Sequence, residues 1–176
     1  MYRFGKWMGE KEMGSQLSSL IVSLEEKSSI DDTLRRLVED TGASHAMLLD
    51  KSGQVIASHG AVERQDITAL GALLAGTFAS SREVARLLRE RDFRVLFQQG
   101  VRENIFTALV EDQWMLAIVF DKGTHIGLVK VLTKKATEEM AGILERVRQE
   151  GKLHDEVLST SFRTSMEDTI DLLFRD

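Results

Sequence analysis

The chain has 176 residues, of which 43% are hydrophobic, so it can bury the core of one domain with short extensions. A formal net charge of −5 argues against a nucleic-acid partner, and the absence of Cys excludes disulfides and thiolate zinc sites. The apolar runs fall far short of the roughly 20 residues that a membrane-spanning helix requires. We expect a cytoplasmic protein without stable membrane insertion.

Residues 1–28 are expected to form an extension ahead of the main domain. The first 14 residues combine aromatic and basic side chains with three glycines, which is typical of a frayed terminus or of an arm that binds a partner. An apolar stripe then predicts a helix: Leu17, Leu20, Ile21 and Leu24.

The main domain, residues 29–150, is predicted to begin with a helix. Ser29 is a plausible N-cap for this helix and Gly42 a plausible C′ residue at its end. Residues 45–50 and 54–58 then flank a short turn that contains a glycine, which predicts a β-hairpin.

A long helix is predicted from Asp66 to about Glu90. Its expected core face is an apolar stripe: Ile67, Leu70, Leu74, Phe78, Val84 and Leu88. Small residues follow the helix at spacings of four: Gly71, Ala75 and Ala79, with Ala72, Gly76 and Ser80 beside them. Each Gly costs up to about 1 kcal/mol of helix stability relative to Ala. We therefore expect another helix or a partner to approach this ridge closely.

Three strands are predicted over residues 93–100, 101–112 and 113–124. The almost wholly apolar segment Trp114–Phe120 indicates a central strand that is buried on both faces. A helix with a plausible N-cap at Thr124 is predicted to follow, up to about residue 149. The predicted fold class is α/β, a five-stranded antiparallel sheet with helices on its faces in the order α-β-β-α-β-β-β-α.

The C-terminal part is predicted to contain a linker, residues 151–164, and a short helix, residues 165–176. Acidic residues occupy one side of this helix. The other side is apolar and consists of Met166, Ile170, Leu173 and Phe174. This pattern is typical of a helix that binds a groove on a partner, and docking on the chain's own body or on a dimer mate is the alternative.

The sequence contains no recognisable catalytic motif, so we expect no active site, no cofactor and no metal site. Gly71 and Gly76 have the spacing of a phosphate loop, but Thr77-Phe78 stands where Lys-Ser/Thr is required. His45 and His59 are expected to lie opposite each other in the hairpin, yet two ligands are too few for zinc.

The order of these motifs resembles the Roadblock/dynein light chain family, and most closely its bacterial MglB group. The matching segments are Leu48–Gly53, Leu70–Gly76, Val119–Thr124 with Gly127–Lys130, and Asp168–Phe174 in the tail. The resemblance implies a homodimer in which the sheet extends across the subunits and the two long middle helices lie side by side.

The resemblance further implies a regulator of a Ras-like small GTPase of the MglA type. It implies a GTPase-activating protein that remodels the switch regions of its partner without an arginine finger. The GTPase would dock on the long helix over Gly71, Ala72, Ala75, Gly76, Ala79 and Glu83. The tail would aid GTPase binding or nucleotide exchange through Met166, Ile170, Asp171, Leu173 and Phe174.

The alternative function is that of a non-catalytic adaptor in a polarity or motility complex. Such a complex could include other polarity proteins and lie at a cell pole. Two features favour this alternative. Glu83 adds charge where the MglB group tends to carry small residues, and residues 1–27 are longer than the group implies. A small-ligand sensor, the third class, would need converging polar groups in a pocket, and the sequence indicates none.

Overall fold

The computed structural model describes the backbone of residues 24–62 and 64–173, and the side chains of residues 25–62 and 66–149. The predictions for residues 1–23 lie outside the described residues. The chain divides into two units, residues 27–143 and a second unit formed by residues 1–26 with 144–176. None of the helices in the described ranges is long and apolar enough to cross a membrane.

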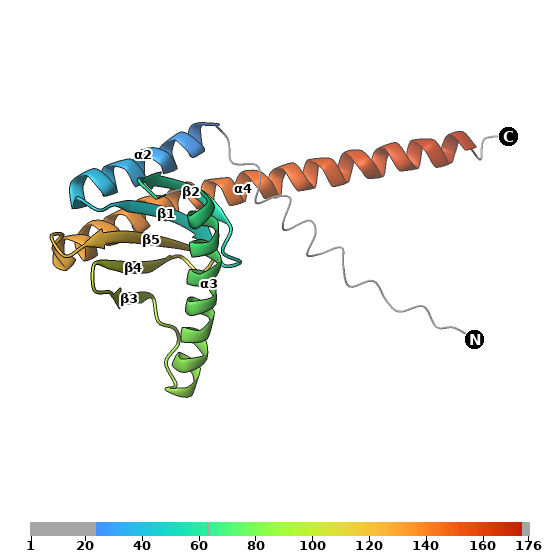
Figure 1. The fold of residues 1–176 in the computed structure, drawn as a ribbon. Coiled ribbons are helices and arrows are strands. Elements are labelled where there is room, and N and C mark those ends of the chain that lie inside the picture. The colour runs from blue at the N-terminus through green and yellow to red at the C-terminus, as the bar shows by residue number, and fades with distance from the viewer. Residues whose placement is uncertain (1–23, 63, 174–176) are drawn as a thin grey trace. The chain divides into compact units, whose positions relative to one another are not determined.

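The elements follow the predicted order α-β-β-α-β-β-β-α (Figure 1). They are α2 (Leu24–Thr41), β1 (His45–Asp50), β2 (Val55–Gly60), α3 (Arg64–Leu87), β3 (Val95–Gln99), β4 (Glu103–Val110), β5 (Trp114–Asp121) and α4 (Ile126–Leu173). The strands form one sheet in the order β2-β1-β5-β4-β3, and every neighbouring pair is antiparallel. The predicted fold class is confirmed.

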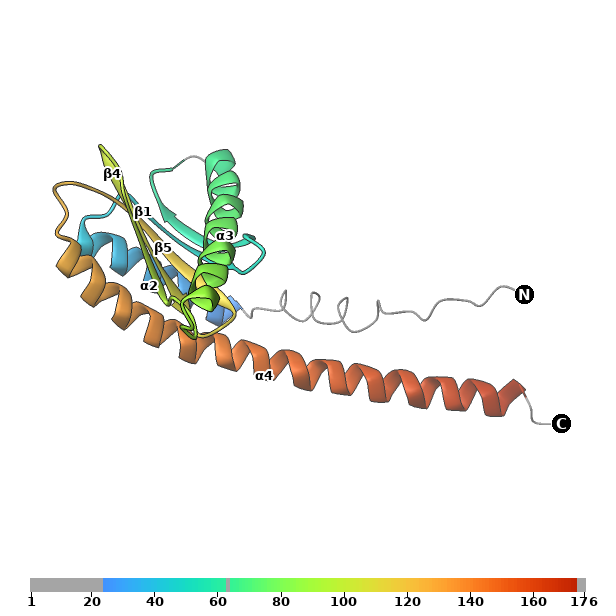
Figure 2. The same cartoon turned by 90° about the horizontal axis from the view of Figure 1, so that it is seen from below.

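The sheet separates two helical layers. Helix α3 lies on one face, and α2 with the first part of α4 lies on the other (Figures 1 and 2). The central position predicted for Trp114–Phe120 is confirmed, since β5 lies between β1 and β4 and all of its residues from Met115 to Phe120 are buried. Both faces of this strand are covered by helices, which is why its sequence is continuously apolar.

Helix α2 begins earlier than predicted. It already includes Leu24, so Ser29 lies in its second turn and the predicted N-cap at this residue is wrong. The residues ahead of Ser29 are mainly Leu, Glu and Lys, which favour helix. The predicted end is confirmed, because Gly42 has a φ of 70° and donates its N–H to the Val38 carbonyl at 2.9 Å.

Helix α4 begins at Ile126, one residue later than an N-cap at Thr124 predicts. The Thr124 hydroxyl does not cap it but donates a hydrogen bond to the Gly42 carbonyl at 3.4 Å, which joins this loop to the end of α2. The His125 carbonyl instead accepts the N–H of Val129 at 3.1 Å, the first bond of the helix. The predicted N-cap role of Thr124 is therefore wrong.

Helix α4 also continues through residues 151–164, for which the sequence predicted a linker, and ends at Leu173. That prediction rested on the lack of an apolar stripe. A helix needs a stripe only to pack, however, and the segment contains no Pro, which would break the helix. The backbone of residues 151–164 is therefore helical and does not form the predicted linker.

Candidate functional site

Helix α3 covers its face of the sheet alone, and its inner side is anchored in an apolar core. Four of its residues pack there: Ile67, Leu74, Ala75 and Phe78. They meet alternate residues of the strands beneath, among them Met47 and Leu49 of β1 and Met115 and Ala117 of β5. The opposite side of α3 is therefore left to solvent in the described unit.

The hairpin turn between β1 and β2 fixes the position of α3. The Asp50 carboxylate accepts the backbone N–H groups of Ser52 and Gln54 at 2.8 and 2.9 Å, which holds the turn closed. The turn then presses against the helix at Gly71, where a Cβ atom would lie 2.6 Å from the carbonyl oxygen of Gly53. Gly71 thus permits a close approach within the chain itself.

The six residues predicted as the GTPase-docking part of this helix divide between its two sides. Gly71 and Ala75 are buried, so part of the small-residue ridge serves internal packing. The other four are exposed and recur at i, i+4, i+7 and i+11, which places them on one outward side: Ala72, Gly76, Ala79 and Glu83.

Large apolar side chains lie beside this small-residue stripe. Leu73, Val84 and Leu87 are 69%, 49% and 79% exposed. The prediction that Val84 and Leu88 belong to the core face is wrong, because the buried stripe continues to Ala85 instead. The spacing i, i+11, i+14 of the three exposed residues was a sequence signal that could have revealed the second apolar side of the helix. We call Ala72, Leu73, Gly76, Ala79, Glu83, Val84 and Leu87 the α3 outer surface.

The charges at the C-terminal end of α3 are held in ion pairs. Arg86 donates to the Glu83 carboxylate from Nε at 3.0 Å and from Nη2 at 2.7 Å. Arg82 lies 3.6 Å from the carboxylate of Asp92, beyond the helix. Most of the α3 outer surface is therefore smooth or apolar, with Glu83 and its partner at one end.

The edge strand β3 provides a second exposed surface. The Leu109 N–H donates to the Arg94 carbonyl at 2.9 Å, and hydrogen-bonded and non-bonded pairs alternate along an antiparallel ladder. Val95, Phe97 and Gln99 therefore direct their N–H and C=O groups away from β4. Phe97 is 43% exposed even though its ring stacks on Phe120, with 6.3 Å between the centroids.

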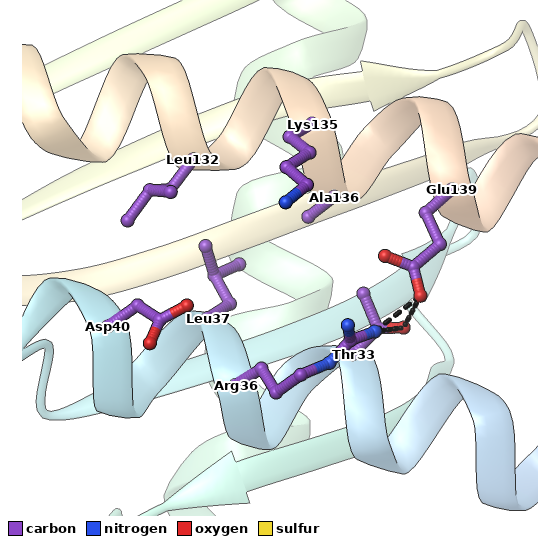
Figure 3. Close-up of a pocket in the computed structure, with 8 residues that line it drawn as sticks. All are labelled: Thr33, Arg36, Leu37, Asp40, Leu132, Lys135, Ala136 and Glu139. Atoms are coloured by element: carbon purple, nitrogen blue, oxygen red, sulfur yellow. Dashed lines mark hydrogen bonds and ion pairs between the residues drawn. The ribbon is translucent and has the colours of Figure 1, made fainter.

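A small hollow lies between α2 and α4 (Figure 3). Its volume is about 50 Å³, which is room for a few water molecules only. Glu139 of α4 accepts a hydrogen bond from the Thr33 hydroxyl at 3.0 Å and forms an ion pair with Arg36, both on α2. This hollow belongs to the contact between the two helices.

The two histidines of the hairpin do not face each other. His45 pairs with Gly60, and His59 pairs with Ala46, so the two side chains point to opposite faces of the sheet. The sequence predicted that His45 and His59 pair directly, but the strand register is shifted by one residue from that pairing. In the ranges that the structure describes, no three side chains of His, Cys, Asp or Glu are placed to hold a metal ion.

The tail residues predicted to bind a partner lie on the C-terminal part of the chain. Met166, Ile170, Asp171 and Leu173 belong to the last turns of α4, and Phe174 follows its end. Their side chains lie outside the described residues.

Comparison with known proteins places these features in a family. The Roadblock/LC7 domain model matches residues 29–120. The solved structure of Myxococcus xanthus MglB is 34% identical, with a TM-score of 0.68, and the match covers 73% of this chain and 96% of that one. The gliding protein MglB from Thermus thermophilus is 30% identical, with a TM-score of 0.69 and coverage of 73% and 97%. No curated protein sequence matches the chain. The chain belongs to the Roadblock/LC7 domain family.

Proposed function

We propose that this protein regulates a Ras-like small GTPase of the MglA type and accelerates its GTP hydrolysis by binding it on the α3 outer surface. The observation that carries this proposal is the exposed combination of a small-residue stripe and three large apolar side chains on one helix. Exposed apolar patches of this kind mark sites of protein–protein contact. The 34% identity with M. xanthus MglB supports a GTPase as the partner.

Activation without a donated arginine fits the charges on this helix. The two α3 arginines with described side chains, Arg82 and Arg86, are each held by a carboxylate. A regulator can still accelerate hydrolysis, because binding energy can hold the GTPase's own catalytic groups and the attacking water in a reactive arrangement. The protein then needs no active site of its own.

Homodimerisation through β3 and α3 is part of the proposal. The outward N–H and C=O groups of β3 can pair with the same strand of a second copy, which would extend the sheet. The solved MglB with a tetrameric arrangement, 29% identical to this chain with a TM-score of 0.70, supports self-association in this group. Pairing would also remove an exposed strand edge from solvent.

We further propose that the tail, residues 165–176, aids binding of the GTPase or its nucleotide exchange. The support is the sequence pattern, in which apolar residues recur at helical spacing beside acidic ones. Deletion of this segment is expected to lower the affinity for the GTPase or the exchange rate and to leave the dimer intact. Dissociation of the dimer would instead show that the tail is required to hold the two subunits together.

Single-turnover hydrolysis by the purified cognate GTPase tests the main proposal. The GTPase is first identified by capture from a cell lysate on the immobilised protein. The lysate is loaded with GTP in one experiment and with GDP in the other. Hydrolysis of a pre-loaded GTP is then followed with and without the full chain. Faster hydrolysis is expected, and the absence of binding to any GTP-bound Ras-like protein would refute the proposal.

An adaptor function is the second candidate, and Glu83 favours it. This residue is exposed on the outward side of α3 and carries charge into an otherwise smooth surface. A desolvated carboxylate at the interface would weaken a tight, activating contact. The same assay separates the two functions, since an adaptor would form the complex and leave the hydrolysis rate unchanged.

A further inference from the structure

A groove on the sheet face opposite α3 remains without an assigned function. It runs between α4 and the outer strands β3 and β4, with a volume of about 470 Å³. Its floor is apolar and comes mainly from the strand residues Val95, Phe106 and Ala108; Leu109 also lines it, but its side chain packs in the core under α3. Its residues belong to the sheet-containing unit, and α4, which forms one wall, lies on the opposite side of the sheet from α3 (Figure 2).

The rim of this groove is basic. Lys130 and Lys134 stand one turn apart on α4 and are both exposed, and Arg94, which directly precedes β3, also lines the groove. Glu138 is the acidic residue in the lining, and Arg94 makes only a distant contact of 3.9 Å with Asp112. The groove therefore presents an excess of positive charge above an apolar floor, although the whole chain is acidic.

A buried hydroxyl in the same lining lacks a partner. Thr133 is fully buried, and its Oγ1 makes no hydrogen bond within the described part of the chain. A helical Thr usually donates to the carbonyl four residues earlier. Leaving a buried hydroxyl unpaired is unfavourable, so a polar atom of a bound segment would have a hydrogen-bonding group to meet here.

We propose that this groove binds the acidic C-terminal segment, residues 165–176, of a second copy of the chain. The segment carries four acidic residues and one basic residue, and its apolar residues recur at helical spacing: Met166, Ile170, Leu173 and Phe174. Acidic and apolar groups thus complement the basic rim and the apolar floor. The segment continues the same helix as Lys134, so an intact α4 cannot fold back onto its own groove.

This contact needs no GTPase and goes beyond the function proposed above. It stores the tail of one subunit on another until a partner competes for it. We expect the tail to bind this groove reversibly, because ion pairs between exposed charges are weak and are screened by salt.

Cross-linking between two single-cysteine variants tests the proposal on the full chain, since the natural sequence has no Cys. Thr137→Cys marks the groove and Ile170→Cys marks the tail, and the two variants are co-expressed with different tags and joined with a short bismaleimide. A mixed cross-link is expected. Lys135→Cys on the side of α4 toward α2 is the matched control and is expected to cross-link at least about fivefold less.

Charge reversal then tests the chemistry of the contact. Lys130→Glu with Lys134→Glu is expected to lower the mixed cross-link at least about fivefold, and Glu167→Lys with Asp171→Lys in the tail is expected to restore it. The pair Lys122→Glu with Lys135→Glu changes charge equally outside the groove and is expected to have no effect. Equal cross-linking at Lys135→Cys, or a yield unchanged by charge reversal, would overturn the proposal.

Discussion

Gly71 of α3 and Gly53 of the hairpin turn hold helix and sheet in close contact. A Cβ atom on Gly71 would lie 2.6 Å from the Gly53 carbonyl oxygen, and both groups belong to the backbone. Neither can move aside alone, so Gly71→Ala is expected to destabilise the fold by about 1–3 kcal/mol, although Ala has the better helix propensity. Urea unfolding of the variant measures this loss.

Gly76→Ala, five residues along the same helix, is the matched comparison. A Cβ atom there would meet nothing within 4 Å. We expect this variant to gain about 0.5–1 kcal/mol from helix propensity alone. If both variants were stabilised, the turn would not constrain the helix.

Ala79→Arg tests the α3 outer surface. Ala79 is exposed, so the change is expected to leave the unfolding free energy within about 0.5 kcal/mol of the natural protein. A bulky cation in the centre of the smooth stripe would prevent close approach and is expected to reduce GTPase stimulation at least about tenfold. Gly142→Arg, at an open position on α4, is the control and is expected to retain stimulation.

Two neighbouring glutamines of β3 distinguish dimer contacts from folding contacts. The Gln99 N–H points away from β4, so Gln99→Pro is expected to weaken the dimer and preserve the monomer fold. The Gln98 N–H points toward β4, so Gln98→Pro is expected to destabilise the monomer itself. Sedimentation velocity reports the oligomeric state, and circular dichroism reports the fold. A dimer unaffected by Gln99→Pro would place the interface elsewhere.

The sequence predicted the sheet well because its signals are local. Alternation, turn glycines and the apolar run of β5 each depend on a few adjacent residues. The division of the α3 ridge could not be predicted, because Gly71 is buried by a turn that is distant in sequence. Val84 was misplaced for a related reason, since apolarity alone does not tell which of two sides of a helix meets the sheet. In α4, residues 151–164 show that helix formation does not require an apolar stripe.

His45 is expected to make stability depend on pH. Its side chain is 1% exposed, and neither ring nitrogen has a hydrogen-bond partner in the described structure. Burial, with a smaller contribution from nearby His59, lowers the pKa of His45 below its usual 6.5. The unfolded chain therefore binds the proton more strongly, so this contribution to stability is complete above about pH 6.5 and falls as the pH drops below it.

His45→Leu removes this titration. We expect the difference in unfolding free energy between about pH 7.5 and pH 5.5 to be smaller in this variant than in the natural protein. His59→Gln, which keeps the buried imidazole, is expected to retain most of the difference. A pH profile unchanged by His45→Leu would show that other groups dominate this range.

The ion pair between Arg36 and Glu139 is expected to contribute measurably to the packing of α2 on α4. The Thr33 hydroxyl lies 3.0 Å from the same carboxylate oxygen and shares its single proton between this oxygen and the Ser29 carbonyl at 2.9 Å, which helps to restrain the carboxylate and reduces the entropy lost when the pair forms. The two side chains are nevertheless 51% and 39% exposed, so solvent screens the attraction. A double-mutant cycle to Ala is expected to give a coupling of about 0.5–1 kcal/mol that decreases in about 0.5 M NaCl.

The pair of Arg35 with Asp32, within α2 at 2.8 Å, is the control and is expected to give a coupling of about 0.2–0.5 kcal/mol. Equal couplings for the two pairs would show that Thr33 adds nothing to the contact between the helices.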